Sequence, residues 1–144
     1  MSYLIDTNVI SELRKGTRAD RQVADWFAGL AEEDVYLSVL TIGEIRKGIE
    51  SIRLRDRRSA APLDRWLHEL VGTHRERILP VDAAVAEEWG RLNVPGPLPV
   101  VGGLLAATAA VHGLVLATRN VKDLRSTDVA LLNPFEPVPA GRQT

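Results

Sequence analysis

Three acidic residues, Asp6, Glu44 and Asp123, come at or shortly after the ends of segments suited to buried strands. The carboxyl ends of parallel strands share one edge of a sheet, where ligands and active sites collect. Carboxylates gathered there would repel one another, which raises their pKa values. A divalent cation reverses that cost, because carboxylate oxygens are preferred ligands of Mg²⁺ and Mn²⁺. The pattern therefore favours a metal site.

Mg²⁺ usually keeps several bound waters, so it can polarise a phosphoryl oxygen and activate a water for attack. A metal site of this kind is suited to cleavage of phosphodiesters. Small polar residues beside the predicted carboxylates are candidates to orient ligands or metal-bound water. These supporting residues are Thr7, Asn8, Thr118 and Asn120.

Each acid also has a purely structural interpretation. Asp6 precedes a predicted helix and would cap it by accepting a backbone N–H. Glu44 would interact favourably with a helix dipole if it lay in a first turn. Asp123 lies in a polar stretch whose composition is ordinary for a turn. The pattern of residues alone leaves both interpretations open for all three side chains.

The elements that must position these residues alternate along the chain, which predicts an α/β domain with a mainly parallel central sheet flanked by helices. Apolar segments predict strands at 3–5, 35–39, 78–81, 114–117 and 129–132. Helical spacing and capping residues predict helices at 8–13, after Asp20, from Thr41, from Pro62, after Asp82 and over 100–111. We expect one domain over residues 1–144, with a Pro-containing tail from about residue 134.

Composition excludes several classes of site. The 144 residues suit one domain, and a net charge of −1 provides no global positive field for nucleic acid. With Cys 0, disulfides and thiolate chemistry are excluded. No apolar run approaches the roughly 18 residues of a membrane span. The strand-like N-terminus has no basic region before it, so we expect no signal peptide and a cytoplasmic protein.

Four motifs in order resemble the PIN-domain ribonucleases, and specifically the VapC-type toxins of bacterial toxin–antitoxin pairs. They are LIDTNVISEL at 4–13, LSVLTIGEIRKGIE at 37–50, LPVVGGLLAATA at 98–109 and LATRNVKDL at 116–124. The resemblance covers essentially the whole chain, and four motifs in register are far more specific than one.

The resemblance implies a PIN-like fold and a Mg²⁺- or Mn²⁺-dependent endoribonuclease whose substrate is tRNA or another structured RNA. It also implies a VapB-type antitoxin partner and a homodimer. Asp6 would bind the metal directly, while Glu44 and Asp123 would bind metal or position the attacking water. Thr118 and Asn120 would be neighbouring polar supports.

Gly102 departs from the family pattern, because it occupies the position where related sequences usually have an aspartate. We expect the fold to tolerate this change, since glycine is nearly as good an N-cap as aspartate. The metal site loses one of the few carboxylates on which Mg²⁺ relies. The hypothesis is that Gly102 weakens or abolishes cleavage.

Two alternative functions remain: a catalytically silent PIN domain that binds RNA or an antitoxin without cutting, and a DNA nuclease with similar metal chemistry. Basic residues near Glu44 are candidate phosphate contacts, although an arginine-rich helix face is often only solvated. These residues are Arg46, Lys47, Arg53 and Arg55, with Arg57 and Arg58 close behind. Apolar stripes at Trp26, Phe27, Trp66 and Leu67 predict core packing, or in part an antitoxin groove or dimer contact.

Overall fold

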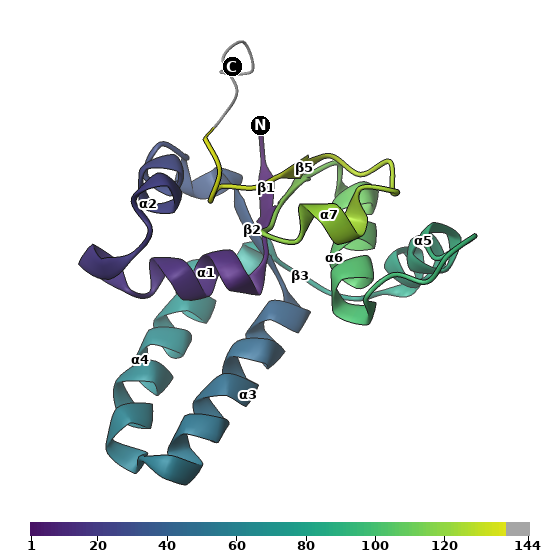
Figure 1. Cartoon of the computed structure of the whole chain (residues 1–144). Helices are drawn as coiled ribbons and strands as arrows, with labels where there is room; N and C mark the ends of the chain where they lie inside the picture. Colours follow the sequence, from purple (N-terminus) through teal and green to yellow (C-terminus); the bar gives the residue numbers. More distant parts are fainter. Residues whose placement is uncertain (138–144) are drawn as a thin grey trace.

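A parallel sheet forms the centre of the molecule, and its strand order is β3-β2-β1-β4-β5 (Figure 1). The computed structural model describes residues 1–137. All four strand pairings are parallel, as the alternation of elements predicted. The strands are β1 (Tyr3–Ile5), β2 (Val35–Ser38), β3 (Ile78–Leu79), β4 (Val115–Ala117) and β5 (Leu131–Leu132).

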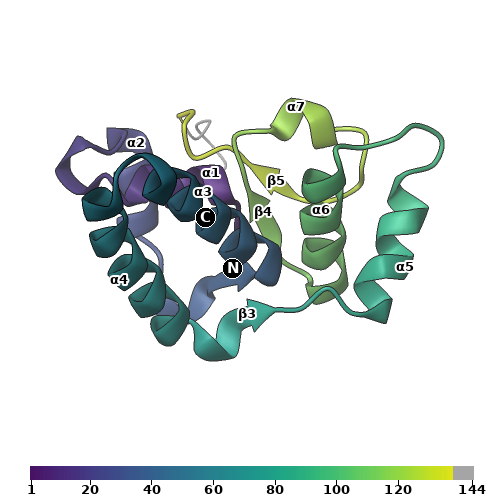
Figure 2. The ribbon, with the colours of Figure 1, turned by 90° about the horizontal axis from the view of Figure 1, so that it is seen from below.

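Helices cover both faces of this sheet. They are α1 (Thr7–Leu13), α2 (Arg21–Ala28), α3 (Val39–Arg55), α4 (Arg57–Thr73), α5 (Ala83–Leu92), α6 (Val100–His112) and α7 (Val121–Leu124). Short 3₁₀ turns cover Gly16–Arg18, Glu32–Asp34 and Arg75–Arg77. Figure 2 shows the α3–α4 pair on one side of the sheet and α5 and α6 on the other. No helix in residues 1–137 has the length and apolar character needed to cross a membrane.

Two hydrophobic clusters result from the alternation of side chains along the strands. In β1, Leu4 packs into the cluster with α6 and α7, and the next residue, Ile5, packs into the cluster with α1 to α4. In β4, Leu116 packs into the cluster with α6 and α7, and Ala117 packs into the cluster with α1 to α4. Successive side chains of a strand point to opposite faces, so a sheet covered on both faces needs apolar residues at every position.

The register of the central strands brings the candidate residues to one edge. Tyr3 of β1 aligns with Val35 of β2 and with Val115 of β4. The Asp6 N–H donates to Ala117 O (2.9 Å), so pairing between β1 and β4 continues to the last residue before their loops. Asp6 and Thr118 therefore emerge side by side at the carboxyl edge of the sheet.

Two helices begin earlier than the sequence predicted, because a better cap lies upstream. Helix α3 begins at Val39, where the Ser38 Oγ accepts from the Leu40 N–H (3.0 Å), and Thr41 lies inside it. Helix α4 begins at Arg57 behind the N-cap Asp56, so Pro62 lies inside this helix.

The carboxylate of Asp56 accepts from the N–H groups of Arg58 (3.0 Å) and Ser59 (3.4 Å). Two satisfied donors in the first turn outweigh the preference of proline for a first-turn position.

Two further boundaries differ from the predictions. The N-cap of α6 is Pro99, which makes Gly102 the third residue of the helix and not its cap. The last strand begins at Leu131 and not at Val129. Of the tail predicted from about residue 134, residues 138–144 lie outside the described part of the chain.

Truncation of Leu116 should destabilise the protein strongly, because this residue is fully buried in the second cluster. We expect Leu116→Ala to lower the free energy of unfolding by about 2–5 kcal/mol, measured by urea denaturation. Leu54→Ala is the control, since Leu54 is 90% exposed, and it should change stability by less than about 0.5 kcal/mol. Equal effects of the two substitutions would contradict this assignment of the core.

Candidate active site

Asp6 has the helix-capping role that the sequence left open, while its metal-binding role stays a prediction. It ends β1 at the carboxyl edge of the sheet and is the N-cap of α1. The Thr7 N–H donates to its Oδ1 (2.6 Å), and the Thr118 hydroxyl donates to its Oδ2 (2.7 Å). The Asn8 side-chain amide lies 3.5 Å from the same Oδ2. Asp6 is only 7% exposed, so a charged carboxylate is held almost out of solvent by donors from the first turn of α1 and from the loop after β4.

Thr7 links Asp6 to Glu44. While its backbone N–H donates to Asp6, its hydroxyl donates to Glu44 Oε1 (2.5 Å). Because α3 begins at Val39, Glu44 lies in the second helical turn, which weakens the interpretation of this residue as a partner of the helix dipole. The structure therefore brings Asp6 and Glu44 together on opposite sides of one threonine, although they are 38 positions apart in the sequence.

Burial sets the electrostatics of this pair. Loss of solvent raises the pKa of Asp6 above its usual value, hydrogen bonds from Thr118 and Thr7 lower it in part, and the charge of Glu44 raises it further. The pKa remains raised because burial is the largest of these effects. A bound cation would favour the ionised form of Asp6, which burial disfavours.

The loop after β4 fixes Asp6 from the other side. The Thr118 hydroxyl donates to Asp6 and also accepts from the Asn120 N–H (3.0 Å). The Asn8 Oδ1 accepts from the Arg119 N–H (3.3 Å), which ties the first turn of α1 to the loop after β4. All four predicted supporting residues thus belong to one network around the Asp6 carboxylate.

Asp123 does not belong to the hydrogen-bond network that contains the other two acids. It lies exposed in α7, and no hydrogen bond joins it to Asp6 or Glu44. Within residues 1–137 no group of three metal-ligating side chains forms. The structure therefore assembles two of the three predicted carboxylates, and a metal role for Asp123 stays a prediction.

Gly102 has room for a side chain. A Cβ placed there would lie 3.7 Å from both Leu124 Cδ2 and Pro99 Cβ, which is ordinary van der Waals contact. An acid at the third position of a helix interacts favourably with the helix dipole. Neither sterics nor helix stability therefore requires glycine at this position.

The residues present fit a hard cation such as Mg²⁺. Their donors are carboxylate and hydroxyl oxygens, and Mg²⁺ is commonly held by one or two carboxylates and several waters. Asp6 and Glu44 supply that minimum.

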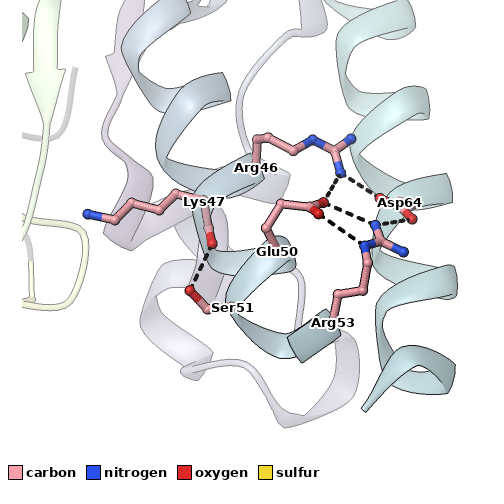
Figure 3. A network of polar contacts seen from close by, with 6 residues as sticks. All are labelled: Arg46, Lys47, Glu50, Ser51, Arg53 and Asp64. Atoms are coloured by element: carbon pink, nitrogen blue, oxygen red, sulfur yellow. Dashed lines mark hydrogen bonds and ion pairs between the residues drawn. The ribbon is translucent and has the colours of Figure 1, made fainter. Parts of the chain in front are cut away.

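Two of the candidate RNA-contacting arginines form ion pairs within the molecule (Figure 3). Arg46 pairs with Asp64 (2.6 Å) and Glu50 (3.0 Å), and Arg53 pairs with the same two acids (2.6 and 3.1 Å). Hydrogen bonds from these arginines lower the pKa values of Glu50 and Asp64 and raise those of the arginines. The positive charges of the two arginines are balanced by the negative charges of Glu50 and Asp64, so this network has no net charge to attract a phosphate.

This network joins α3 to α4, since Asp64 belongs to the second helix and the other three residues to the first. The i, i+4 spacing of Arg46 and Glu50 is a signal in the sequence for this pairing. The remaining candidates, Lys47 and Arg55, are exposed and form no ion pair within residues 1–137. A contact of these two residues with RNA stays a prediction.

A largely apolar groove leads away from the acidic pair. One hollow of about 120 Å³ begins at Thr7 and Glu44 and is lined by Ile45, Ile49 and Trp66. A second hollow of about 530 Å³ shares Arg14, Ile52, Leu63 and Trp66 with the first and extends to Pro62. Trp66 thus faces a groove, whereas Leu67 is buried in the core and Trp26 packs edge-on against Tyr3.

Comparison with known proteins identifies the class of this fold and site. The sequence model of the PIN domain matches residues 3–129, and the chain therefore belongs to the PIN domain family.

Two relatives place it more narrowly within that family. The chain is 34% identical to Toxin FitB of Neisseria gonorrhoeae over 137 residues, which cover 92% of this chain and 97% of that protein. It is 33% identical to VapC ribonuclease Y4jK of Sinorhizobium fredii over 139 residues, or 93% of this chain and 98% of the relative. The resemblance drawn from the four motifs is thereby confirmed.

Solved structures agree with this assignment. The crystal structure of FitAcB from Neisseria gonorrhoeae matches 94% of this chain and 99% of the compared chain, with a TM-score of 0.84 and 32% identity. The structure of FitAB bound to the IR36 DNA fragment matches with a TM-score of 0.85 and 31% identity, covering 96% and 99% of the two chains. The predicted PIN-like α/β fold is confirmed.

Asp6→Asn should stabilise the protein at neutral pH. Since the pKa of Asp6 is higher in the folded protein than in the unfolded chain, folding stability falls as pH rises between those two values. At pH values above the folded pKa, the buried charge destabilises the folded protein in full. At pH values below the unfolded pKa, about 3.9, the carboxyl is neutral and this destabilisation is absent. We expect Asp6→Asn to have a higher Tm than the unmodified protein at neutral pH and to lose this gain below about pH 4.

The control for this measurement is Asp20→Asn, at the exposed N-cap of α2. Asparagine and aspartate cap helices about equally well, so this variant should show no gain at neutral pH. A lower Tm for Asp6→Asn at neutral pH, or a gain that persists unchanged in acid, would contradict the role of burial.

Arg53→Gln should weaken the joint between α3 and α4, because this arginine contacts both acids of the network. We expect Tm to fall by roughly 1–3 °C at low salt and by less at high salt, since exposed ion pairs are screened. Thermal unfolding followed by circular dichroism measures this. Arg55→Gln removes an equal charge without an ion pair, and equal Tm values for the two variants would argue against the joint.

Proposed function

We propose that this chain is a metal-dependent endoribonuclease and the toxin of a toxin–antitoxin pair. The observation that supports this most directly is the Asp6–Thr7–Glu44 unit at the carboxyl edge of the sheet, braced by Thr118. It is an acidic site made only of oxygen donors, on a fold whose relatives include a protein named as a ribonuclease. We infer that the activity is cytoplasmic, as the sequence analysis predicted.

In this proposal Asp6 binds Mg²⁺ or Mn²⁺ directly, and Glu44 binds the same ion or accepts the proton of the attacking water. A divalent ion at these residues supplies charge neutralisation at the phosphate and an activated water. Thr118 and the Thr7 N–H hold the Asp6 carboxylate in one orientation, and the Thr7 hydroxyl does the same for Glu44. Asp123, on the short helix after β4, is proposed as the third acid of the set, which binds metal or positions the attacking water as the family resemblance implies.

The proposed substrate is RNA, with tRNA or another structured RNA as the class that the family resemblance implies. Lys47 and Arg55 are the candidate contacts that remain free of internal ion pairs in residues 1–137. A comparison of RNA with DNA of the same sequence separates this proposal from a DNA nuclease.

The proposed partner is a VapB-type antitoxin. The matched structures are those of FitAcB and of FitAB, the latter bound to a DNA fragment. The groove from Glu44 to Pro62 offers isoleucine, leucine and tryptophan side chains, which suits the apolar face of a partner helix. A homodimer is also proposed, on the family resemblance alone.

A silent PIN domain is the second candidate function, and Gly102 is the observation that favours it. The glycine removes one carboxylate, and the described residues hold no group of three metal ligands. Such a protein would still bind RNA or the antitoxin.

Cleavage of RNA by the purified protein, titrated with Mg²⁺ and Mn²⁺, tests the proposal. We expect slow cleavage that Asp6→Asn abolishes, and an increase on the order of tenfold or more in Gly102→Asp, because a further carboxylate strengthens metal binding. Metal binding has its own readout: Mg²⁺ should raise the Tm of the unmodified protein and of Gly102→Asp, but not that of Asp6→Asn.

Gly102→Ala is the matched control, because it adds the Cβ without the carboxylate and has room to do so. It should leave cleavage unchanged. If the metal raises Tm but neither the unmodified protein nor Gly102→Asp cleaves RNA, the silent PIN domain is supported. If the metal has no effect on Tm, the metal site is rejected.

A further inference from the structure

Arg119 is fixed beside the acidic site by its backbone. It directly follows Thr118, and its N–H donates to the side chain of Asn8, whose amide lies 3.5 Å from Asp6 Oδ2. The residue itself is exposed. The backbone of Arg119 is therefore fixed in the same loop that supplies Thr118 to the Asp6 carboxylate.

An aromatic ring holds this guanidinium in place. The Arg119 Cζ lies 3.8 Å from the centroid of the Phe135 ring. Phe135 in turn packs against the hydrophobic cluster formed with α1 to α4, so the ring is a fixed platform. A cation–π contact uses the charge of the guanidinium but not its N–H groups, which stay available as hydrogen-bond donors.

No carboxylate neutralises Arg119 within residues 1–137, because it forms no ion pair there. The charge of Arg119 reaches Glu12, but both oxygens of that carboxylate are engaged. One accepts from Lys15 Nζ (3.0 Å) and the other from the Asp20 N–H (2.8 Å). Accordingly, the pKa of Glu12 is lowered first by the Asp20 N–H and then by Lys15, with Arg119 the smallest contributor. Arg119 thus differs from Arg46 and Arg53, whose donors are occupied by two acids.

We propose that Arg119 binds a backbone phosphate of the RNA next to the one at the acidic site, and that Phe135 positions its guanidinium for this contact. This inference rests on the proposed function and assigns one substrate contact to the same site. A guanidinium matches two phosphate oxygens with parallel N–H donors. Its positive charge also offsets the repulsion between Asp6, Glu44 and an approaching RNA strand. The guanidinium lies over Phe135 and, within the described residues, forms no hydrogen bond or ion pair with Asp6, so we place its contact at a neighbouring phosphate.

The test measures binding of a fluorescently labelled single-stranded RNA of mixed sequence, with EDTA present so that cleavage does not interfere. Between about 50 and 200 mM salt, we expect Arg119→Gln to lower affinity on the order of tenfold at the low-salt end and to reduce the slope of log affinity against log salt by about 0.7. Arg119→Lys should restore the slope, since it keeps the charge. Phe135→Leu should keep the slope and lower affinity by roughly threefold through loss of the aromatic platform.

Arg75→Gln is the matched control, since Arg75 is exposed in the 3₁₀ turn before β3, at the opposite edge of the sheet. It should leave the slope unchanged. If Arg119→Gln keeps the same slope as Arg75→Gln while RNA still binds, Arg119 only secures the segment around Phe135 and the proposal is overturned. If the unmodified protein binds no RNA under these conditions, this contact is rejected, while the proposed function is judged separately by the cleavage assay titrated with Mg²⁺ and Mn²⁺.

Discussion

The structure depends on the burial of one carboxylate at the end of its central strand. Asp6 is 7% exposed, and desolvation of a charged carboxylate is costly unless donors or cations replace the lost water. Three donors do so here: Thr7 and Asn8 in the first turn of α1, and Thr118 in the loop after β4. Helix α1, the loop after β4 and Glu44 are all arranged around this one side chain.

The position of β1 in the sheet explains why Asp6 can hold these elements together. With β2 on one side and β4 on the other, its carboxyl end is flanked by two further strand ends. The loop after β4 supplies Thr118, and α3, which follows β2, supplies Glu44. A strand at the edge of the sheet would have had only one such neighbour. The site is therefore a consequence of the strand order 3-2-1-4-5 and not of any single motif.

Much of this arrangement could be predicted from the sequence because it follows from local rules. Strand ends in a parallel sheet share an edge, which is enough to bring Asp6, Thr118 and the helix that carries Glu44 to one place. Asp123 lies six residues beyond β4, and its orientation depends on how α7 packs through Leu124, which no periodicity reveals.

Contacts between elements distant in the sequence were outside the reach of local rules. Asp64 is 18 positions from Arg46 and 11 from Arg53, so their pairing depends on the register between two helices. Arg119 and Phe135 meet only because the chain returns after β5 to the face covered by α1 to α4. Arginines therefore have different contacts in this structure: Arg46 and Arg53 form ion pairs, whereas Arg119 stacks on an aromatic ring. The local sequence pattern does not distinguish them.

The order of the effects on the pKa of Asp6 decides what Gly102 changes. Burial is the largest effect and the charge of Glu44 the smallest of those that act on this carboxylate. The residue at position 102 is not among the groups that act on Asp6, so the burial of Asp6 does not depend on it. The tendency of Asp6 to take up a proton or a cation is therefore a property of its position at the end of β1. In the proposed function, an additional carboxylate at position 102 would add a ligand, which governs how firmly an ion is held and oriented.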